Sequence, residues 1–307
     1  MAQAVTRSGE VGARPAGYVP KGRRMKRRQG KQVIVVVGLA IFLVFMLGPV
    51  ALMVIVSVSP EANLLQVPPQ WIPTPPNLTH HVDLLTENLR VTGAEGFRRA
   101  LLNTVVVAVS VTVFCVLIGS LAGYAYARLR MPGGNQLILV LLFSQLLPSI
   151  AVLIPLFVTL RALNLIDNLA SLIVLEVAFQ LPFTVFILRG YFMSLPSELE
   201  DAAMVDGCGR VGALFRIIMP LSTPGLFAVS VFAYLAAWNA FLIPLVFTNS
   251  PDTRTAPLAV ALLRGRFYTE FGLLAAAGTL TILVPVVLTL IFQRYILEGL
   301  VAGAIKG

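Results

Sequence analysis

Six segments of this chain are apolar over runs long enough to cross a lipid bilayer. A helix needs roughly 20 residues to span a hydrocarbon core of about 30 Å. Inside lipid every backbone polar group must also find a partner within the protein, and a helix provides one. The sequence therefore predicts an all-α polytopic membrane protein with six transmembrane helices, at about residues 33–58, 101–127, 137–160, 170–188, 224–247 and 272–293.

The composition excludes an ordinary soluble domain. Apolar residues make up 57% of the chain and charged residues only 12%, and the mean hydropathy is +0.87. The first segment has no charged residue from Gln32 to Pro60 and is too long for a cleaved signal peptide, so we expect a retained anchor. Residues 1–32 are rich in Gly, Pro and Arg and are expected to form a disordered basic tail, followed by one membrane domain, residues 33–307.

The basic residues predict the orientation of the chain. The tail carries nine Lys and Arg residues against one acid, Glu10, and such an excess marks the cytoplasmic side. Six helices then place the C-terminus on the same side, with 16 basic residues inside and 7 outside. The net charge of +9 is concentrated in the tail, whose one aromatic residue is Tyr18, so we expect contact with anionic lipid rather than nucleic acid.

The segment between the fourth and fifth apolar runs, residues 197–225, is polar and reads SELEDAAMVDGCGRVGALFRIIMPLSTPG. Ser197, followed three residues later by Glu200, forms a capping box that predicts a helix beginning near Glu198. Acidic residues in its first turn interact favourably with the helix dipole. Gly207 stands where a helix would end in a residue with positive φ.

A second helical run is predicted from Arg210 to Met219, ended by Pro220. Its apolar residues repeat at helical spacing and lie on one face, formed by Val211, Leu214, Phe215 and Ile218. Two short helices joined at a glycine corner form a compact knob that fits a partner's groove. An amphipathic hairpin on the lipid surface is the alternative, but four acidic residues suit an anionic membrane poorly.

The spacing of this segment resembles the EAA loop of bacterial ABC importer permeases, which is roughly E-A-A, three residues, G, nine residues, I-x-L-P. Here it reads Asp201-Ala202-Ala203, Gly207 and Ile217-Ile218-Met219-Pro220, with Asp201 where Glu is usual and Met219 where Leu is usual. In that family the loop docks on a separate ATPase subunit. The resemblance implies an ATPase-coupling role for Glu200, Asp201, Ala202, Ala203, Asp206, Gly207, Ile217 and Pro220.

Three further segments resemble the carbohydrate, maltose-type class of these permeases, so that the resemblance covers residues 33–307. The Pro-rich stretch 68–76 contains PP-x-W-x-P, the stretch 234–244 contains WN-x-F, and the C-terminal stretch 293–307 is similar to QRY…GLTAGAVKG. The first is either a contact for a solute-binding protein or a structural loop, and the last implies contact with the ATPase pair. Ala240 departs from the pattern, since many relatives carry an acid there.

Candidate residues for a substrate pathway lie inside the apolar segments. An ionisable residue at such depth is costly and usually faces a partner, a cavity or a water path. The pair Trp-Asn offers an apolar ring face and an amide, which suit a sugar. Helix packing is an equally open interpretation for the candidates Glu176, Gln180, Trp238 and Asn239.

Other kinds of site are not supported by the sequence. There is no G-x-x-x-x-G-K-[ST] loop for ATP and no catalytic cluster. Cys115 and Cys208 fall in different environments and are not expected to pair, and His80-His81 with Asp83 is better explained as a solvated pair than as metal ligands. We therefore expect no catalytic residue, metal or cofactor in this chain, with ATP and Mg on the partner ATPase.

The resemblance implies a permease subunit of an ATP-binding cassette importer that moves a sugar or oligosaccharide by alternating access. The implied partners are an ATP-binding subunit dimer, a second permease subunit, an extracytoplasmic solute-binding protein and membrane lipid, in a bacterial or archaeal cytoplasmic membrane with both termini cytoplasmic. An importer of another solute, such as a glycerophosphodiester or polyol, is the alternative. A stand-alone secondary transporter fits less well, because paired intramembrane charges are scarce and no internal repeat is evident.

Overall fold

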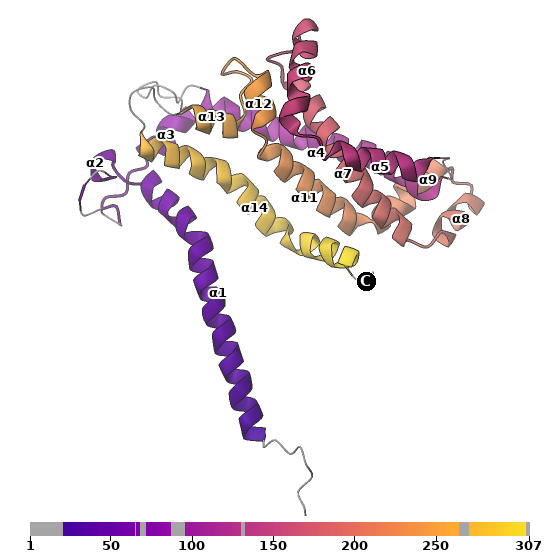
Figure 1. Cartoon of the computed structure of the whole chain (residues 1–307), viewed down its shortest axis with the longest axis horizontal. Helices are drawn as coiled ribbons and strands as arrows, with labels where there is room; N and C mark the ends of the chain where they lie inside the picture. The colour runs from indigo at the N-terminus through magenta and orange to yellow at the C-terminus, as the bar shows by residue number, and fades with distance from the viewer. Residues whose placement is uncertain are drawn as a thin grey trace, which may run out of the picture. The chain divides into compact units, whose positions relative to one another are not determined.

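The computed structural model of the chain describes residues 21–64, 66–67, 72–86, 96–129, 133–263 and 270–304, and their side chains apart from residues 21–31, 135 and 295–304. The predictions on residues 1–20, on Trp71 and on the C-terminal side chains fall outside these residues. The chain divides into two compact units, residues 1–52 and 53–307. Within the described residues, every regular element is a helix (Figure 1).

The longest helices are α1 (Lys21–Ser57), α4 (Phe97–Arg128), α7 (Leu169–Ser194) and α14 (Phe271–Ala304). Intermediate ones are α5 (Gly134–Ser144), α6 (Ser149–Ala162) and α11 (Thr223–Trp238). The short ones are α2 (Glu61–Leu64), α3 (Thr79–Thr86), α8 (Glu198–Val205), α9 (Arg210–Ala213), the π-helical turn η1 (Leu214–Ile218), α10 (Met219–Leu221), α12 (Leu242–Phe247) and α13 (Ala256–Leu262).

The helix α1 contains the first predicted span but starts earlier than expected. Its part from Gln32 to Ser57 is an apolar helix of 26 residues, long enough to cross a bilayer. The structure describes a helical backbone from Lys21 onward, within the tail for which the sequence predicts disorder. Lys, Arg and Gln are good helix formers, and the helix therefore continues through the basic residues.

Four helices in the described residues are long and apolar enough to cross a membrane unbroken, and up to six spans result if each of two bent helix pairs is one span. The unbroken spans lie in α1, α4, α7 and α14, which confirms the first, second, fourth and sixth predicted spans. The chain is therefore an all-α polytopic membrane protein.

The third predicted span is not one straight helix. Its residues form α5 and α6, which meet at 89°. Pro148 is the N-cap of α6, the last residue before that helix begins, and it has no backbone N–H to donate. Gln145, just after α5, donates through its side chain to the Phe179 carbonyl of α7 at 2.7 Å, so the exposed turn is held by a neighbouring helix.

The fifth predicted span, 224–247, is also interrupted. The helix α11 ends at Trp238, and α12 begins at Leu242. The Asn239 side chain donates to the Leu235 carbonyl at 2.7 Å, and the ring of Pro244 would clash with the carbonyl four residues earlier in a continuous helix. The two effects together explain why a run that is apolar in sequence breaks in the structure.

The helices α4 and α7 pack along each other at glycines of α4. A Cβ atom at Gly119 would lie 2.5 Å from Thr184 Cγ2, and one at Gly123 would lie 3.1 Å from the Arg189 nitrogen. Small residues spaced by four allow two helix backbones to approach closely. The helix α11 joins this pair, since Gly225 at its start leaves no room for a Cβ beside the Tyr191 ring.

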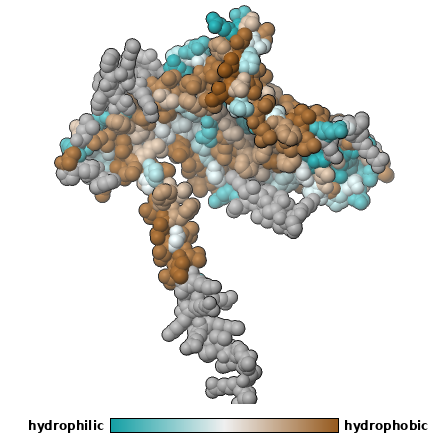
Figure 2. All heavy atoms as spheres, viewed as in Figure 1, coloured by the Kyte–Doolittle hydropathy of each residue, from teal (hydrophilic) through white to brown (hydrophobic). Residues whose placement is uncertain are grey.

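The surface of the described helices is largely hydrophobic, as expected for contact with lipid tails. Figure 2 shows brown, hydrophobic spheres over the long helices, with hydrophilic residues at the end that carries α8 and at the tip of α6. Large apolar side chains of α4 that point outward include Leu102, Val106 and Leu121, which are 60%, 50% and 47% exposed. Exposed apolar surface of this extent is typical of a membrane or interaction surface.

Candidate functional site

The helix α8 begins where the sequence predicts, at Glu198, with Glu198, Glu200 and Asp201 in its first turn. The predicted capping box is wrong. Ser197 already has helical torsions (φ −69°, ψ −25°) and its side chain makes no capping hydrogen bond. Its carbonyl instead accepts the backbone N–H groups of Glu200 and Asp201, at 3.0 and 3.1 Å.

The end of α8 is a Schellman motif built on Gly207. Gly207 has φ +86°, which confirms the predicted positive φ. The backbone N–H of Cys208 donates to the Ala203 carbonyl at 2.9 Å, and that of Gly207 donates to the Met204 carbonyl at 3.1 Å. These two bonds satisfy the last carbonyls of the helix and fix the direction in which the chain leaves it.

The second predicted run forms α9, η1 and α10, but Pro220 does not end it. The helical backbone continues to Leu221, and a bend of 84° then separates it from α11. The π-helical turn η1 precedes the proline, and the Met219 N–H bonds to the Leu214 carbonyl five residues back. A widened turn gives a proline ring room beside the preceding carbonyls, so the helix accommodates Pro220.

The apolar face predicted for this run is divided between core and surface. Leu214 and Ile218 are 1% and 0% exposed and pack in a cluster with residues of α4, α7 and α11, namely Tyr124, Leu188, Phe192 and Val229. Val211 and Phe215 are 63% and 44% exposed. The structure therefore anchors one part of the run in the helix bundle and leaves the other available to a partner.

The predicted coupling residues are divided in the same way. Five are exposed: Asp201, Ala202, Asp206, Gly207 and Pro220. Ile217 is half-buried, whereas Glu200 and Ala203 are each 4% exposed. We name the exposed residues of α8 with its C-cap, α9 and η1 the docking surface, and its members are Glu198, Leu199, Asp201, Ala202, Val205, Asp206, Arg210, Val211, Phe215 and Arg216.

Glu200 is held by two side chains of α4 that the sequence did not identify. The Tyr124 hydroxyl donates to Glu200 Oε1, and Arg128 Nε lies 3.3 Å from Glu200 Oε2. Arg128 also donates through Nη2 to the Leu195 carbonyl, at the end of α7, at 2.8 Å. The signal in the sequence was the spacing of Tyr124 and Arg128, four residues apart at the end of an apolar segment.

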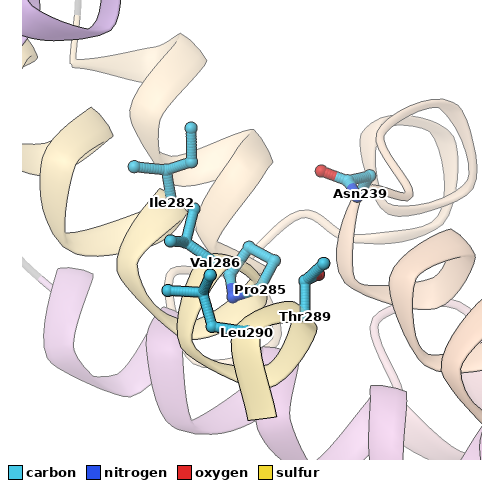
Figure 3. A pocket seen from close by; sticks show the side chains of 6 residues that line it. All are labelled: Asn239, Ile282, Pro285, Val286, Thr289 and Leu290. Carbon is cyan, nitrogen blue, oxygen red and sulfur yellow. The ribbon is translucent and has the colours of Figure 1, made fainter. Parts of the chain in front are cut away.

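The two candidates Trp238 and Asn239 have different surroundings. Trp238 is 1% exposed, its ring stacks on Tyr234 with centroids 5.7 Å apart, and its Nε1 donates to the Thr281 carbonyl of α14 at 3.2 Å. These contacts join α11 to α14. Asn239 is exposed and lies across a pocket from one face of α14 (Figure 3).

The pocket beside Asn239 has a volume of about 350 Å³. It opens where α11 ends, and its other lining residues, all from α14, are Ile282, Pro285, Val286, Thr289 and Leu290 (Figure 3). Asn239 and Thr289 are its polar side chains. A pocket of this size with two polar groups can contact part of a polar solute, but it offers few hydrogen bonds to fix one.

Glu176 and Gln180 lie one turn apart on α7 and contact each other. Gln180 Nε2 donates to Glu176 Oε2 at 3.4 Å, and Glu176 is 5% exposed. Among the described residues, its other oxygen, Oε1, has no hydrogen-bond partner. The structure therefore buries this carboxyl inside the subunit, while Gln180 is half-buried beside it.

At the opposite end of the bundle, Asp167 joins the turn between α6 and α7 to the segment after α12. Asp167 Oδ1 accepts the backbone N–H groups of Asn249 and Ser250, at 2.9 and 3.0 Å, and the Thr253 hydroxyl. Partial burial raises the pKa of this carboxyl, but the hydrogen bonds from Thr253, Asn249 and Ser250 outweigh it and hold the pKa well below its usual range.

His80 and His81 are both half-buried. Burial, and next the neighbouring His80, lower the pKa of His81. Within the described residues, no group of three or more His, Cys, Asp or Glu side chains is arranged to hold a metal ion.

Residues 115–300 match the family described as the binding-protein-dependent transport system inner membrane component. The chain is 34% identical over 268 residues to the sulfoquinovosyl glycerol transport system permease protein SmoH of Agrobacterium fabrum, covering 87% of this chain and 92% of that protein. It is 32% identical over 286 residues to the trehalose/maltose transport system permease protein MalG of Thermococcus litoralis, covering 92% and 100%.

The fold resembles that of a chain of a bacterial ABC transporter involved in the import of the acidic polysaccharide alginate, with a TM-score of 0.73 at 21% identity, over 91% of this chain and 99% of that one. A structure of the alginate transporter in complex with alginate pentasaccharide-bound periplasmic protein matches with a TM-score of 0.64 at 16% identity, over 89% and 97%. Together with the family match, the described helices and the EAA-like loop identify this chain as a member of the binding-protein-dependent transport inner membrane components and a multi-pass permease subunit of an ABC importer.

Proposed function

We propose that this subunit couples ATP hydrolysis in a separate ATPase to the import of a sugar or oligosaccharide. The observation that carries the coupling role is the docking surface, which exposes apolar, acidic and basic side chains on a segment that is firmly anchored on its other face. Val205 is 87% exposed and Val211 63%, while Leu214 and Ile218 of the same segment are buried. Exposed apolar groups of this kind are typical of an interaction site.

The carbohydrate cargo is supported by the relatives. One relative is a permease of a sulfoquinovosyl glycerol transport system, and another is a permease of a trehalose/maltose transport system. The solved structure with a similar fold is of an ABC transporter involved in the import of alginate. For this chain, Asn239 is the proposed pathway residue, because its amide lies at the pocket beside α14. Glu176 and Gln180 are proposed to make the pathway more polar from inside the helix bundle. Trp238 is proposed to hold α11 against α14.

The proposed assembly contains further proteins. The exposed knob is a fitting contact for an ATP-binding subunit dimer, which would hold ATP and Mg, while this chain binds no cofactor and no nucleic acid. A second permease subunit would complete the pathway, and an extracytoplasmic solute-binding protein would deliver the cargo, in keeping with the family's description. Lipid surrounds the apolar helices, with both termini on the cytoplasmic side of a bacterial or archaeal membrane.

In the proposed cycle, ATP draws two ATPase subunits together and moves the docking surface with them. The permease then passes between inward-facing and outward-facing states by a shift in their populations. The role of Gly207 is to keep α8 at a fixed angle, so that motion of the partner moves the helices instead of bending the loop. Asp201, Ala202 and Asp206 are the proposed contacts on α8.

The test is an affinity purification of the tagged chain in mild detergent, followed by identification of the co-purifying subunits and an ATPase assay. We expect an ATP-binding subunit and a second permease, and we expect Asp201→Lys to reduce the recovery of the ATPase while the chain remains inserted. Gly209→Ala serves as a matched control in the same loop. A chain that purifies alone and transports without ATP would overturn the proposal.

The cargo is tested separately on the solute-binding protein that co-purifies. Trehalose, maltose and sulfoquinovosyl glycerol are offered in turn, and binding is measured by calorimetry. Affinity for one of these or a related glycoside supports the sugar proposal. Selective binding of a glycerophosphodiester or a polyol would replace it without affecting the coupling role.

A further inference from the structure

We infer that Glu200 is a positioning residue, which ties the loop to α4 and α7 within this chain instead of contacting the ATPase subunit. The inference rests on the proposed coupling function and gives one acid of the EAA-like segment a different role from its neighbours. It names Tyr124 and Arg128 as the partners through which Glu200 acts.

The burial of Glu200 separates it from the acids of the docking surface. Glu200 is 4% exposed, and Asp201, the next residue on the same helix, is exposed. Consecutive residues of a helix point about 100° apart, so α8 directs one carboxylate inward and the next one outward. A carboxylate that is enclosed by its own chain is not accessible to a partner protein.

Both oxygens of Glu200 are engaged by side chains of α4. Tyr124 and Arg128 are four residues apart and therefore lie on the same face of the helix. Tyr124 donates to Oε1, and Arg128 lies 3.3 Å from Oε2, with the two side chains of this ion pair 12% and 6% exposed. Arg128 donates at the same time to the Leu195 carbonyl, so a single carboxylate and a single guanidinium connect α4, α7 and α8.

An apolar cluster supports this polar link. Tyr124 packs with Leu188, Phe192, Leu214 and Ile218, which belong to α4, α7 and η1. Moving α8 away from α4 would separate buried, oppositely charged groups from each other and expose this cluster, and both are costly. The loop therefore transmits displacement to α4 and α7 as one body.

The test measures the distance between α8 and α4 in the importer complex. Spin labels are placed at the exposed positions Ser197, at the start of α8 and outside the docking surface, and Leu121 of α4, in a background with Cys115→Ser and Cys208→Ser. Distances are recorded without nucleotide and after trapping with MgATP and orthovanadate. With Glu200 present, we expect one narrow distance that is the same in both states, because the two helices move together.

The variant Glu200→Gln keeps the shape of the side chain and removes its charge. We expect it to recover the ATPase subunit as well as the unsubstituted chain does, while trapping shifts or broadens the distance between the labels. Tyr124→Phe, which loses only the hydroxyl, should broaden the distance less. Asp201→Asn is the matched control, expected to lower recovery of the ATPase and leave the distance narrow.

Two results would overturn the inference. One is a distance in Glu200→Gln that stays narrow and equal in the two states. The other is a loss of ATPase recovery in Glu200→Gln as large as that in Asp201→Asn, which would make Glu200 a docking contact. Failure of the proposed function looks different, since no ATPase subunit would then co-purify with the unsubstituted chain.

Discussion

Alanine at Gly207 tests whether backbone torsion alone fixes the corner of the loop. Gly207 has φ +86°, and a Cβ built on it meets no heavy atom within 4 Å. Alanine there adds no clash, so its cost is that of an L-residue in the left-handed region, about 1–2 kcal/mol. Gly209 has equal space but φ −70° and ψ 164°, which any residue adopts, and it provides a matched control.

The difference between Gly207→Ala and Gly209→Ala gives a lower bound on this torsional energy, because Gly209 is the N-cap of α9 and alanine is a poor N-cap. Replacing glycine by alanine at either position also lowers the conformational entropy of the unfolded chain, which stabilises the fold by about 0.4–1 kcal/mol. This contribution is the same in both variants and cancels in the comparison. We expect the end of α8 to open more easily in Gly207→Ala than in Gly209→Ala by about 1–2 kcal/mol, a factor of about 5–30 in the opening equilibrium. Gly207→Asn should fall between glycine and alanine, because asparagine tolerates the left-handed region.

Hydrogen–deuterium exchange with mass spectrometry, on the subunit purified in detergent, measures this opening directly. Peptides that cover residues 198–209 should exchange faster in Gly207→Ala, whereas peptides from the buried part of α4 serve as an internal reference. Equal exchange in the two alanine variants would refute the torsional argument. Faster exchange in both would indicate that the loop tolerates no side chain at either position.

Three further substitutions test the surroundings of the site. Trp238→Phe removes the N–H that donates to the Thr281 carbonyl. We expect the loss of this hydrogen bond to lower the free energy of unfolding in detergent by about 0.5–1.5 kcal/mol and to leave uptake near normal. A loss of uptake at unchanged stability would instead place Trp238 on the pathway. Asn239→Ala should reduce uptake with little change in the melting temperature, and unchanged uptake would count against the pocket. Asp167→Asn should loosen residues 247–253 by at most about 1 kcal/mol at pH 7, since the group is partly exposed, and exchange of that segment reports it. Because folding lowers the pKa of Asp167, its stabilisation is full above the unfolded pKa of about 3.9 and is lost as the pH falls below that value toward the folded pKa. Amide exchange itself depends on pH, so the readout is the protection of this segment relative to the unfolded-chain rate at the same pH, and protection that does not fall with the pH would contradict this.

The parts of the loop set by local backbone preferences were predicted from the sequence. The start of α8 and the positive φ of Gly207 depend on residues within one or two turns, and both are confirmed. Pro220 shows the limit of such reasoning. A proline usually ends a helix, but the π-helical turn before it depends on how Leu214 and Ile218 fit the cluster around Tyr124, which no local pattern reveals.

The division of the loop between buried and exposed residues required the tertiary structure. In the sequence, Val211 and Leu214 are three residues apart and fall on one face of a helix, while Glu200 and Asp201 are consecutive acids of the same motif. Which member of each group is buried depends on where the end of α4 lies against α8 and η1. The spans follow the same rule: apolar length identifies the four unbroken ones, whereas the turn before Pro148 is held by a side-chain bond from Gln145 to α7. The break after Trp238 has local causes, the Asn239 side chain and Pro244.

A buried ion pair is weak evidence for stability, because replacing both partners by apolar groups is often neutral or favourable. The link between Glu200 and Arg128 is better explained by geometry. Apolar side chains at these positions would also bury α8 against α4, but they would allow it to slide, whereas a carboxylate that bonds Tyr124 and pairs with Arg128 has one favourable position. Arg128 extends this fixed position to the end of α7. The proposed role of α8, to transmit force between two proteins, needs such a defined position on its own side, and the Schellman motif at Gly207 fixes the angle of the segment that follows.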